Sequence, residues 1–113
     1  MLNIKTIKSI SNQEGWKLKI NKESYDFTMY CKSGLKYNFS IEKVKDNNLN
    51  NLINKVYDQF LDYVVDKEFE VYIRCNKTSS YRKILNDCKE IDRKLEELAK
   101  RLTAYRYIKL RKD

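Results

Sequence analysis

The sequence predicts a single α+β domain over residues 1–113, in which an antiparallel sheet of four or five strands is covered on one face by two helices. Three observations predict this class. Apolar residues alternate with polar ones through much of the first 41 residues, which is typical of half-buried strands. Apolar residues then recur at helical spacing after residue 48, and again in a longer run toward the end. Finally, 113 residues is the size of one domain.

Four strands are expected in the first part of the chain. Leu2, Ile4 and Thr6 alternate with polar residues and predict a short first strand, followed by a turn over residues 9–15. Three strands joined by tight turns then form an antiparallel meander with one apolar face. Their apolar residues are Trp16, Leu18 and Ile20, then Tyr25, Phe27, Met29 and Cys31, then Leu35, Tyr37, Phe39 and Ile41.

A helix and one more strand are expected in the middle of the chain. Helical spacing of apolar residues predicts a helix from Leu49 to Val65, and the Asp and Asn side chains of residues 46–48 are suited to capping its start. The alternation of Phe69, Val71 and Ile73 predicts a strand from Glu68 to Cys75 that joins the meander.

A long helix is predicted from Ser79 to about Tyr105, with Ser79 or Ser80 as its N-cap. Its apolar residues follow each other at alternating steps of three and four, which is a heptad seam. The seam is formed by Tyr81, Ile84, Cys88, Ile91, Leu95, Leu98 and Leu102. It either covers the core of its own domain or pairs two copies of the chain as a homodimer. Residues 106–113 either continue this helix or form a last strand.

Composition argues against catalysis. The chain has no histidine, so it lacks Ser-His and Cys-His nucleophile pairs and the commonest zinc ligand. Its two glycines cannot build a phosphate-binding glycine loop. Cys31, Cys75 and Cys88 are scattered singly, which is a poor disulfide framework and indicates reduced thiols. We expect no enzyme activity, no cofactor and no bound metal.

The charge pattern favours a polyanionic partner. The net charge is +8, and the first 40 residues and the last 33 carry the excess of Lys and Arg. One candidate contact surface is the outer face of the meander, with Lys17, Lys19, Tyr30 and Lys36, beside Thr28, Lys32 and Asn38. A second is a terminal cluster formed by Arg101, Tyr105, Arg106, Tyr107, Lys109 and Arg111. Arg82 and Lys83 are further candidates for partner contact. The helix dipole disfavours cations in the first turn of a helix, so their position indicates a role other than helix stability. The alternative is that these are ordinary solvated charges.

Tyrosines provide a separate argument for a protein partner. Nine tyrosines are more than a core of this size needs, and Tyr with Arg is the pairing that interface anchors favour. No stretch of about 18 apolar residues is present, so we expect no membrane span and no membrane partner.

The second half of the chain contains the run SSYRKILNDCKEIDRKLEELAKRL at residues 79–102, preceded by NNLINKVYDQFLDYVVD at 50–66 and FEVYI at 69–73. This layout resembles small accessory proteins of phages and conjugative elements, some of which are anti-CRISPR proteins. The resemblance implies a stoichiometric inhibitor that acts in the host cytoplasm by occupying a nucleic-acid channel or locking an effector nuclease. Many such inhibitors are acidic mimics of DNA, and this basic chain departs from that pattern.

Two functions are therefore expected from the sequence. The first is a non-catalytic inhibitor that binds a CRISPR-type nuclease or ribonucleoprotein of a host defence system. The second is a basic module that binds RNA or DNA directly.

Overall fold

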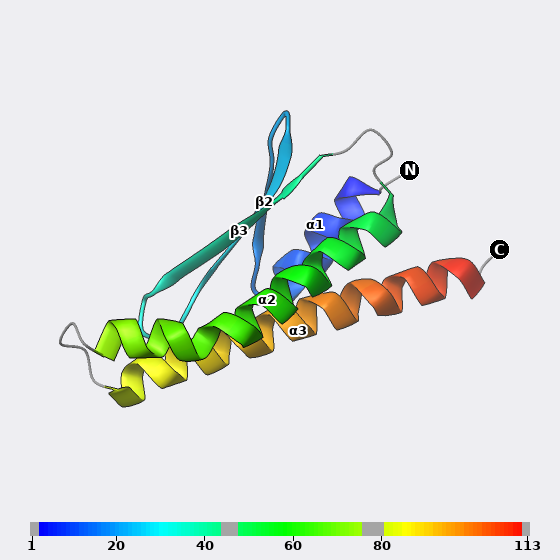
Figure 1. Ribbon diagram of the computed structural model, residues 1–113. Helices are drawn as coiled ribbons and strands as arrows, with labels where there is room; N and C mark the ends of the chain where they lie inside the picture. The colour runs from blue at the N-terminus through cyan, green and yellow to red at the C-terminus, as the bar shows by residue number, and fades with distance from the viewer. Residues whose placement is uncertain (1–2, 44–47, 76–80, 112–113) are drawn as a thin grey trace.

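The computed structural model describes residues 3–43, 48–75 and 81–111. These form α1 (Ile4–Gln13), β1 (Lys17–Ile20), β2 (Ser24–Tyr30), β3 (Lys36–Glu42), α2 (Leu49–Cys75) and α3 (Tyr81–Arg111). The two long helices α2 and α3 run side by side in opposite directions, and the sheet and α1 lie along the same side of this pair (Figure 1). The predicted α+β class is confirmed.

The predicted meander is confirmed, with strand order β1-β2-β3 and antiparallel pairing throughout. Leu18 pairs with Phe27, and Phe27 pairs with Phe39, so one buried row crosses all three strands. Gly34, with a φ of 95°, lies in the turn between β2 and β3, where its amide donates to the carbonyl of Cys31. In β2 and β3, residues of odd number face the helices and those of even number face outward, whereas in β1 Leu18 faces the helices and Lys17 and Lys19 face outward.

The expected first strand is wrong, because residues 4–13 form the helix α1. Asn3 caps this helix by accepting a hydrogen bond from the Thr6 amide at 3.3 Å. Ile7 and Ile10 are buried on one side of α1, and Ile4 is half-buried one step before them. Ile4, Ile7 and Ile10 recur every three residues, which is typical of one side of a helix, whereas the alternation that predicted a strand extends only to Thr6. Leu2 lies outside the described residues.

The expected strand from Glu68 to Cys75 is also wrong, since α2 continues to Cys75. Neither Gly nor Pro occurs between residues 49 and 75 to end the helix, and α2, with 27 residues, packs along α3, which has 31. The sheet therefore has three strands in the described ranges, instead of four or five. Asn48 caps α2 by accepting from the Asn51 amide at 2.9 Å, as predicted; the other proposed caps, residues 46, 47, 79 and 80, lie outside the described part.

The heptad seam of α3 lies in the protein's own interior. Its described side chains, Ile84, Cys88, Ile91, Leu95, Leu98 and Leu102, are between 0% and 2% exposed. These side chains therefore pack within the protein's own core, which is the first of the two alternatives for the seam. The side chain of Tyr81 lies outside the described part. The helix continues to Arg111, which answers the question left open for residues 106–111.

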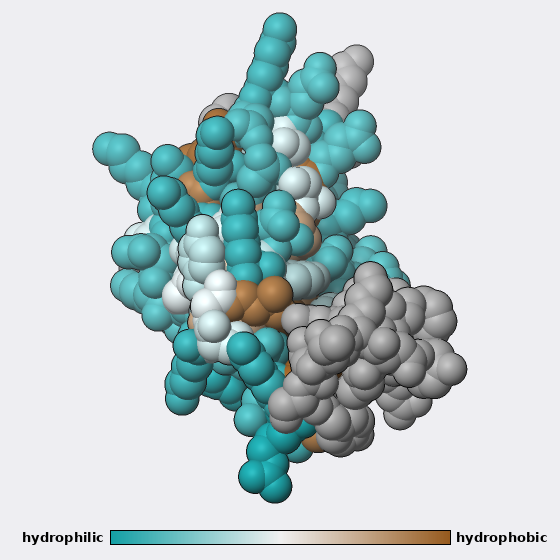
Figure 2. Space-filling view, turned by 90° about the vertical axis from the view of Figure 1, so that its left-hand side faces the viewer, coloured by the Kyte–Doolittle hydropathy of each residue, from teal (hydrophilic) through white to brown (hydrophobic). Residues whose placement is uncertain are grey.

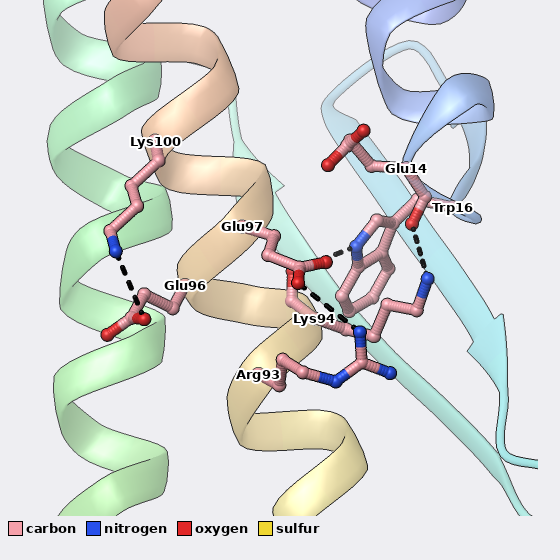
Figure 3. Close-up of polar contacts among 7 residues, drawn as sticks. All are labelled: Glu14, Trp16, Arg93, Lys94, Glu96, Glu97 and Lys100. Carbon is pink, nitrogen blue, oxygen red and sulfur yellow. Dashed lines mark hydrogen bonds and ion pairs between the residues drawn. The ribbon is translucent and has the colours of Figure 1, made fainter.

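Trp16 is the centre of the core on the sheet side. Its ring meets Phe39 edge-on at 5.4 Å between centroids, and Phe27 stacks on Phe39 at 4.9 Å. Its indole Nε1 donates to the backbone oxygen of Lys94 in α3 (Figure 3).

Arg93 pairs with Glu97 and Lys100 with Glu96 on the outer side of α3. Within the described ranges, none of the helices combines the length and apolarity that crossing a membrane requires.

Candidate functional site

The outer face of the sheet carries the four candidates assigned to it. Lys17, Lys19, Tyr30 and Lys36 are all exposed there. Tyr30 is 64% exposed and pairs directly with Lys36 across β2 and β3. Lys32, placed on the same face by the sequence, instead lies in the turn that follows β2. An exposed tyrosine can stack on a planar group while the lysines beside it bind an anion.

At the opposite end of this face, three polar side chains donate hydrogen bonds to Asp26. Ser40 donates to the Asp26 carboxylate at 2.6 Å, Ser24 donates at 3.0 Å, and Asn21 donates as well. Chiefly because of the Ser40 hydrogen bond and then that of Ser24, the pKa of Asp26 is held below its usual value. Asp26 therefore stays ionised and offsets Lys19, and the basic character is concentrated around Tyr30.

A large open hollow lies where the β2–β3 turn meets the first turns of α3. It has a volume of about 640 Å³. Its lining, called here the α3 hollow, is Lys32, Ser33, Arg82, Lys83, Asn86, Asp87, Lys89, Glu90 and Arg93. Five cations thus face two acids, and the described surface at this end of the molecule is mainly hydrophilic (Figure 2). Arg82 and Lys83, which the helix dipole disfavours, are part of this lining.

Both acids of the α3 hollow bind the turn. Ser33 Oγ donates to Asp87 Oδ1 at 2.7 Å, and the Lys32 amide donates to Glu90 Oε1 at 3.1 Å. Asp87 is only 4% exposed, so its charge is directed at the turn and away from solvent. Both acids of the hollow are therefore already engaged, and of its five cations Arg93 is paired with Glu97.

Cys31, Asp87 and Glu90 place a thiol and two carboxylates within 4.8 Å of one another. Such a group has the donor types of a metal site. However, two of its members already accept hydrogen bonds from the turn, and five cations surround it. The electrostatics of the hollow favour an anion over a cation.

A second, smaller hollow of about 390 Å³ lies between α1 and β1. This α1–β1 hollow is lined by Lys5, Lys8, Ser9, Asn12, Trp16, Lys17 and Leu18. Three of these residues are cations and none is acidic. Lys17 is shared between this hollow and the outer face of the sheet.

The two described arginines of the terminal cluster predicted from sequence contact different helices. Arg101 binds the Gln13 side-chain oxygen at 2.6 Å and lies 3.7 Å from Glu14, whereas Arg106 donates to Asn50. Tyr105 packs against the core, and Tyr107 is 65% exposed. The side chains of Lys109 and Arg111 lie outside the described part. The described arginines of this cluster therefore join α3 to α1 and α2.

Sequence reasoning missed four cations of the two hollows: Lys5, Lys8, Lys89 and Arg93. A signal for the last two was present, because they follow Arg82 by seven and eleven residues and so share its side of a helix. Lys5 and Lys8 could not be assigned while their segment was expected to be a strand.

A scan against models of protein families, a search of curated proteins and a search of solved structures each found no match to this chain. Its function is accordingly inferred from the residues that the fold brings together.

Proposed function

We propose that the protein is a non-catalytic binding protein for nucleic acid, and that the α3 hollow is its main contact with phosphate. The observation that carries the proposal is the lining of this hollow, in which five cations surround two acids that are already hydrogen-bonded to the turn. Lys and Arg are the residues that neutralise phosphates, and Arg does so with a planar fork of donors.

The position of Arg82 and Lys83 supports this assignment. Both lie in the first turn of α3, where a cation is unfavourable by a few tenths to about 1 kcal/mol each. A bound phosphate at the same end would relieve that repulsion and would also meet the positive end of the helix dipole. The two residues destabilise the free helix slightly and are suited to a bound anion.

The proposal predicts strongly salt-dependent binding. A nucleic acid that meets all five cations releases one counterion per phosphate, which gives a log–log slope of about −3 to −5 against salt concentration. We would measure this slope by fluorescence anisotropy with labelled single-stranded and duplex oligonucleotides.

Charge reversal at the hollow provides the specific test. The double variant Arg82→Glu, Lys83→Glu is compared with Lys22→Glu, Lys55→Glu, which changes the net charge equally at two exposed positions outside both hollows. We expect the first variant to lose at least about tenfold in affinity and to flatten the slope by about two phosphates, and the second to change little. Equal losses in both variants, or no binding of the wild type at low salt, would contradict the proposal.

The second candidate function is inhibition of a CRISPR-type nuclease through a protein contact. It is favoured by Tyr107 and Ile108, two large side chains that are 65% and 56% exposed at consecutive positions near the end of α3. The resemblance to phage and conjugative-element accessory proteins adds to it. The test is a target-cleavage assay with a purified effector nuclease, its guide and increasing amounts of this protein. Stoichiometric inhibition that Tyr107→Ser, Ile108→Ser removes and Arg82→Glu, Lys83→Glu retains would favour this function.

A further inference from the structure

We propose that the ligand is a single-stranded nucleic acid, which runs from the α1–β1 hollow past Tyr30 to the α3 hollow and stacks a base on the Tyr30 ring. This inference rests on the proposed function and adds the class of nucleic acid and its path.

Tyr30 is an exposed aromatic residue that lies between two lysines on the sheet face. Its side chain is 64% exposed on the outer face of the sheet, although tyrosine is a large, partly apolar residue. Lys36 is its direct cross-strand partner, so the two Cβ atoms lie about 4.5 to 5.5 Å apart. Lys17 pairs with Thr28, two residues before Tyr30, and is thus a diagonal neighbour at about 7 to 8 Å. A ring between two cations can stack on a base while the cations meet the adjoining phosphates.

Lysines on either side of Tyr30 connect the two hollows. Lys17 lines the α1–β1 hollow and also borders Tyr30 on the sheet face. Lys32 follows Tyr30 by two residues and lines the α3 hollow. The cations therefore continue from α1, across the end of the sheet, to α3. The acids of the outer face, Asp26 and Glu42, lie toward the opposite end of the strands and do not interrupt this path.

The exposed ring favours a single strand over a duplex. A base in a duplex is stacked on both faces by its neighbours, so an isolated tyrosine on a sheet cannot reach it. An unpaired base has a free face, and stacking on it tolerates any sequence. Phosphates are common to both forms, so the cations alone would not distinguish them. The Tyr30 ring is the feature that does.

The experiment compares oligothymidine, oligouridine and a duplex of equal length by anisotropy at one fixed salt concentration. Each is titrated with the wild type, Tyr30→Ala, Tyr30→Phe and Leu61→Ala. Leu61 is the control because it is also exposed, at 55%, but lies on α2 outside both hollows. Circular dichroism and thermal melting confirm that each variant is folded.

We expect Tyr30→Ala to weaken single-strand binding between about fivefold and a hundredfold, which is the range for loss of one base–aromatic stack. Duplex binding should be unchanged by it. Tyr30→Phe should retain affinity because the ring is kept, and Leu61→Ala should match the wild type. The DNA and RNA arms differ in the 2′-hydroxyl and in the C5-methyl of the base, and binding of either single strand with this pattern supports the proposal.

Two results would overturn the inference while leaving the proposed function intact. One is salt-dependent binding that is equally tight for duplex and single strands. The other is single-strand binding that Tyr30→Ala does not weaken, or that Tyr30→Phe weakens as much as Tyr30→Ala. Absence of binding to all three oligonucleotides at low salt would instead remove the proposed function together with the inference.

Discussion

Trp16 and Lys94 take part in two hydrogen bonds that connect the same two segments of the chain. The Trp16 indole donates to the backbone oxygen of Lys94 at 3.3 Å, and the Lys94 ammonium donates to the backbone oxygen of Glu14, two residues before Trp16, at 3.2 Å. The pair thereby attaches the junction of α1 and β1 to the middle of α3 (Figure 3). This attachment fixes the position of Lys17, which is the residue that follows Trp16 and is shared by the sheet face and the α1–β1 hollow.

Trp16→Phe is expected to destabilise the protein by about 1 to 3 kcal/mol, because it removes the hydrogen bond to Lys94 and part of a ring that is 1% exposed. Trp16→Ala should cost about 3 to 5 kcal/mol. Urea unfolding followed by circular dichroism measures both values. Equal stability of Trp16→Phe and wild type would show that neither the indole N–H nor the larger ring contributes.

Gly15→Ala tests the backbone at the same junction. Gly15 has a φ of 86°, where an L-residue is disfavoured by about 1 to 2 kcal/mol, and an added Cβ would lie 3.0 Å from the Lys94 ammonium. Gly34→Ala is the matched control, since Gly34 has a φ of 95° with nothing within 4 Å of its Cβ position. Both variants should lose stability because alanine is disfavoured at a positive φ. Thermal melting should show the larger loss for Gly15→Ala, where the added Cβ also approaches Lys94. A larger loss for Gly34→Ala would contradict the close approach of Lys94.

Leu95→Ala and Leu98→Ala test the buried seam. Both side chains are 0% exposed, so each substitution should cost about 2 to 5 kcal/mol through lost burial and an unfilled cavity. Sedimentation of the wild type and the variants is measured alongside chemical unfolding. A change of sedimentation without loss of stability would indicate that the seam pairs two chains after all.

The meander could be predicted because its signals are local. Each strand alternates apolar and polar residues, and each turn is short, so the pairing Leu18–Phe27–Phe39 follows from pattern and turn length. The two segments expected as strands but found in helices carry only short alternating patterns. The alternation of Leu2, Ile4 and Thr6 stops at Ile7, whereas Ile4, Ile7 and Ile10 recur every three residues, and residues 68–75 alternate but belong to a helix that runs beside α3.

The candidate site was predictable only where it lies on one face of the predicted sheet. Lys17, Tyr30 and Lys36 share a sheet face, and alternation alone assigns that face. The α3 hollow combines Lys32 with Arg82 and Lys89, which are at least 50 residues away in sequence. Its existence depends on the hydrogen bonds from the turn to Asp87 and Glu90, and these are tertiary contacts.

Arg82→Glu, Lys83→Glu should change stability and binding in opposite directions. Acids in the first turn of a helix are favourable, and α3 has none there, so the variant should be as stable as the wild type or up to about 1 to 2 kcal/mol more stable. Oligonucleotide affinity should fall at least about tenfold in the same protein. Melting and anisotropy on one preparation measure the two effects. Parallel loss of stability and affinity would show that these cations support the fold.

Asp26 should make stability depend on acidic pH. Its pKa is lowered in the folded protein, first by the Ser40 hydrogen bond and then by that of Ser24, so the folded state binds the proton more weakly than the unfolded chain does. The contribution of Asp26 is therefore complete above its unfolded pKa and is lost as pH falls through its folded pKa. Melting temperatures across this acidic range should converge for wild type and Asp26→Asn, and differ at neutral pH. Ser40→Ala, which removes the leading donor, should move the pKa of Asp26 upward in a carboxyl-carbon NMR titration. An unchanged titration of Asp26 in Ser40→Ala would contradict the assigned cause.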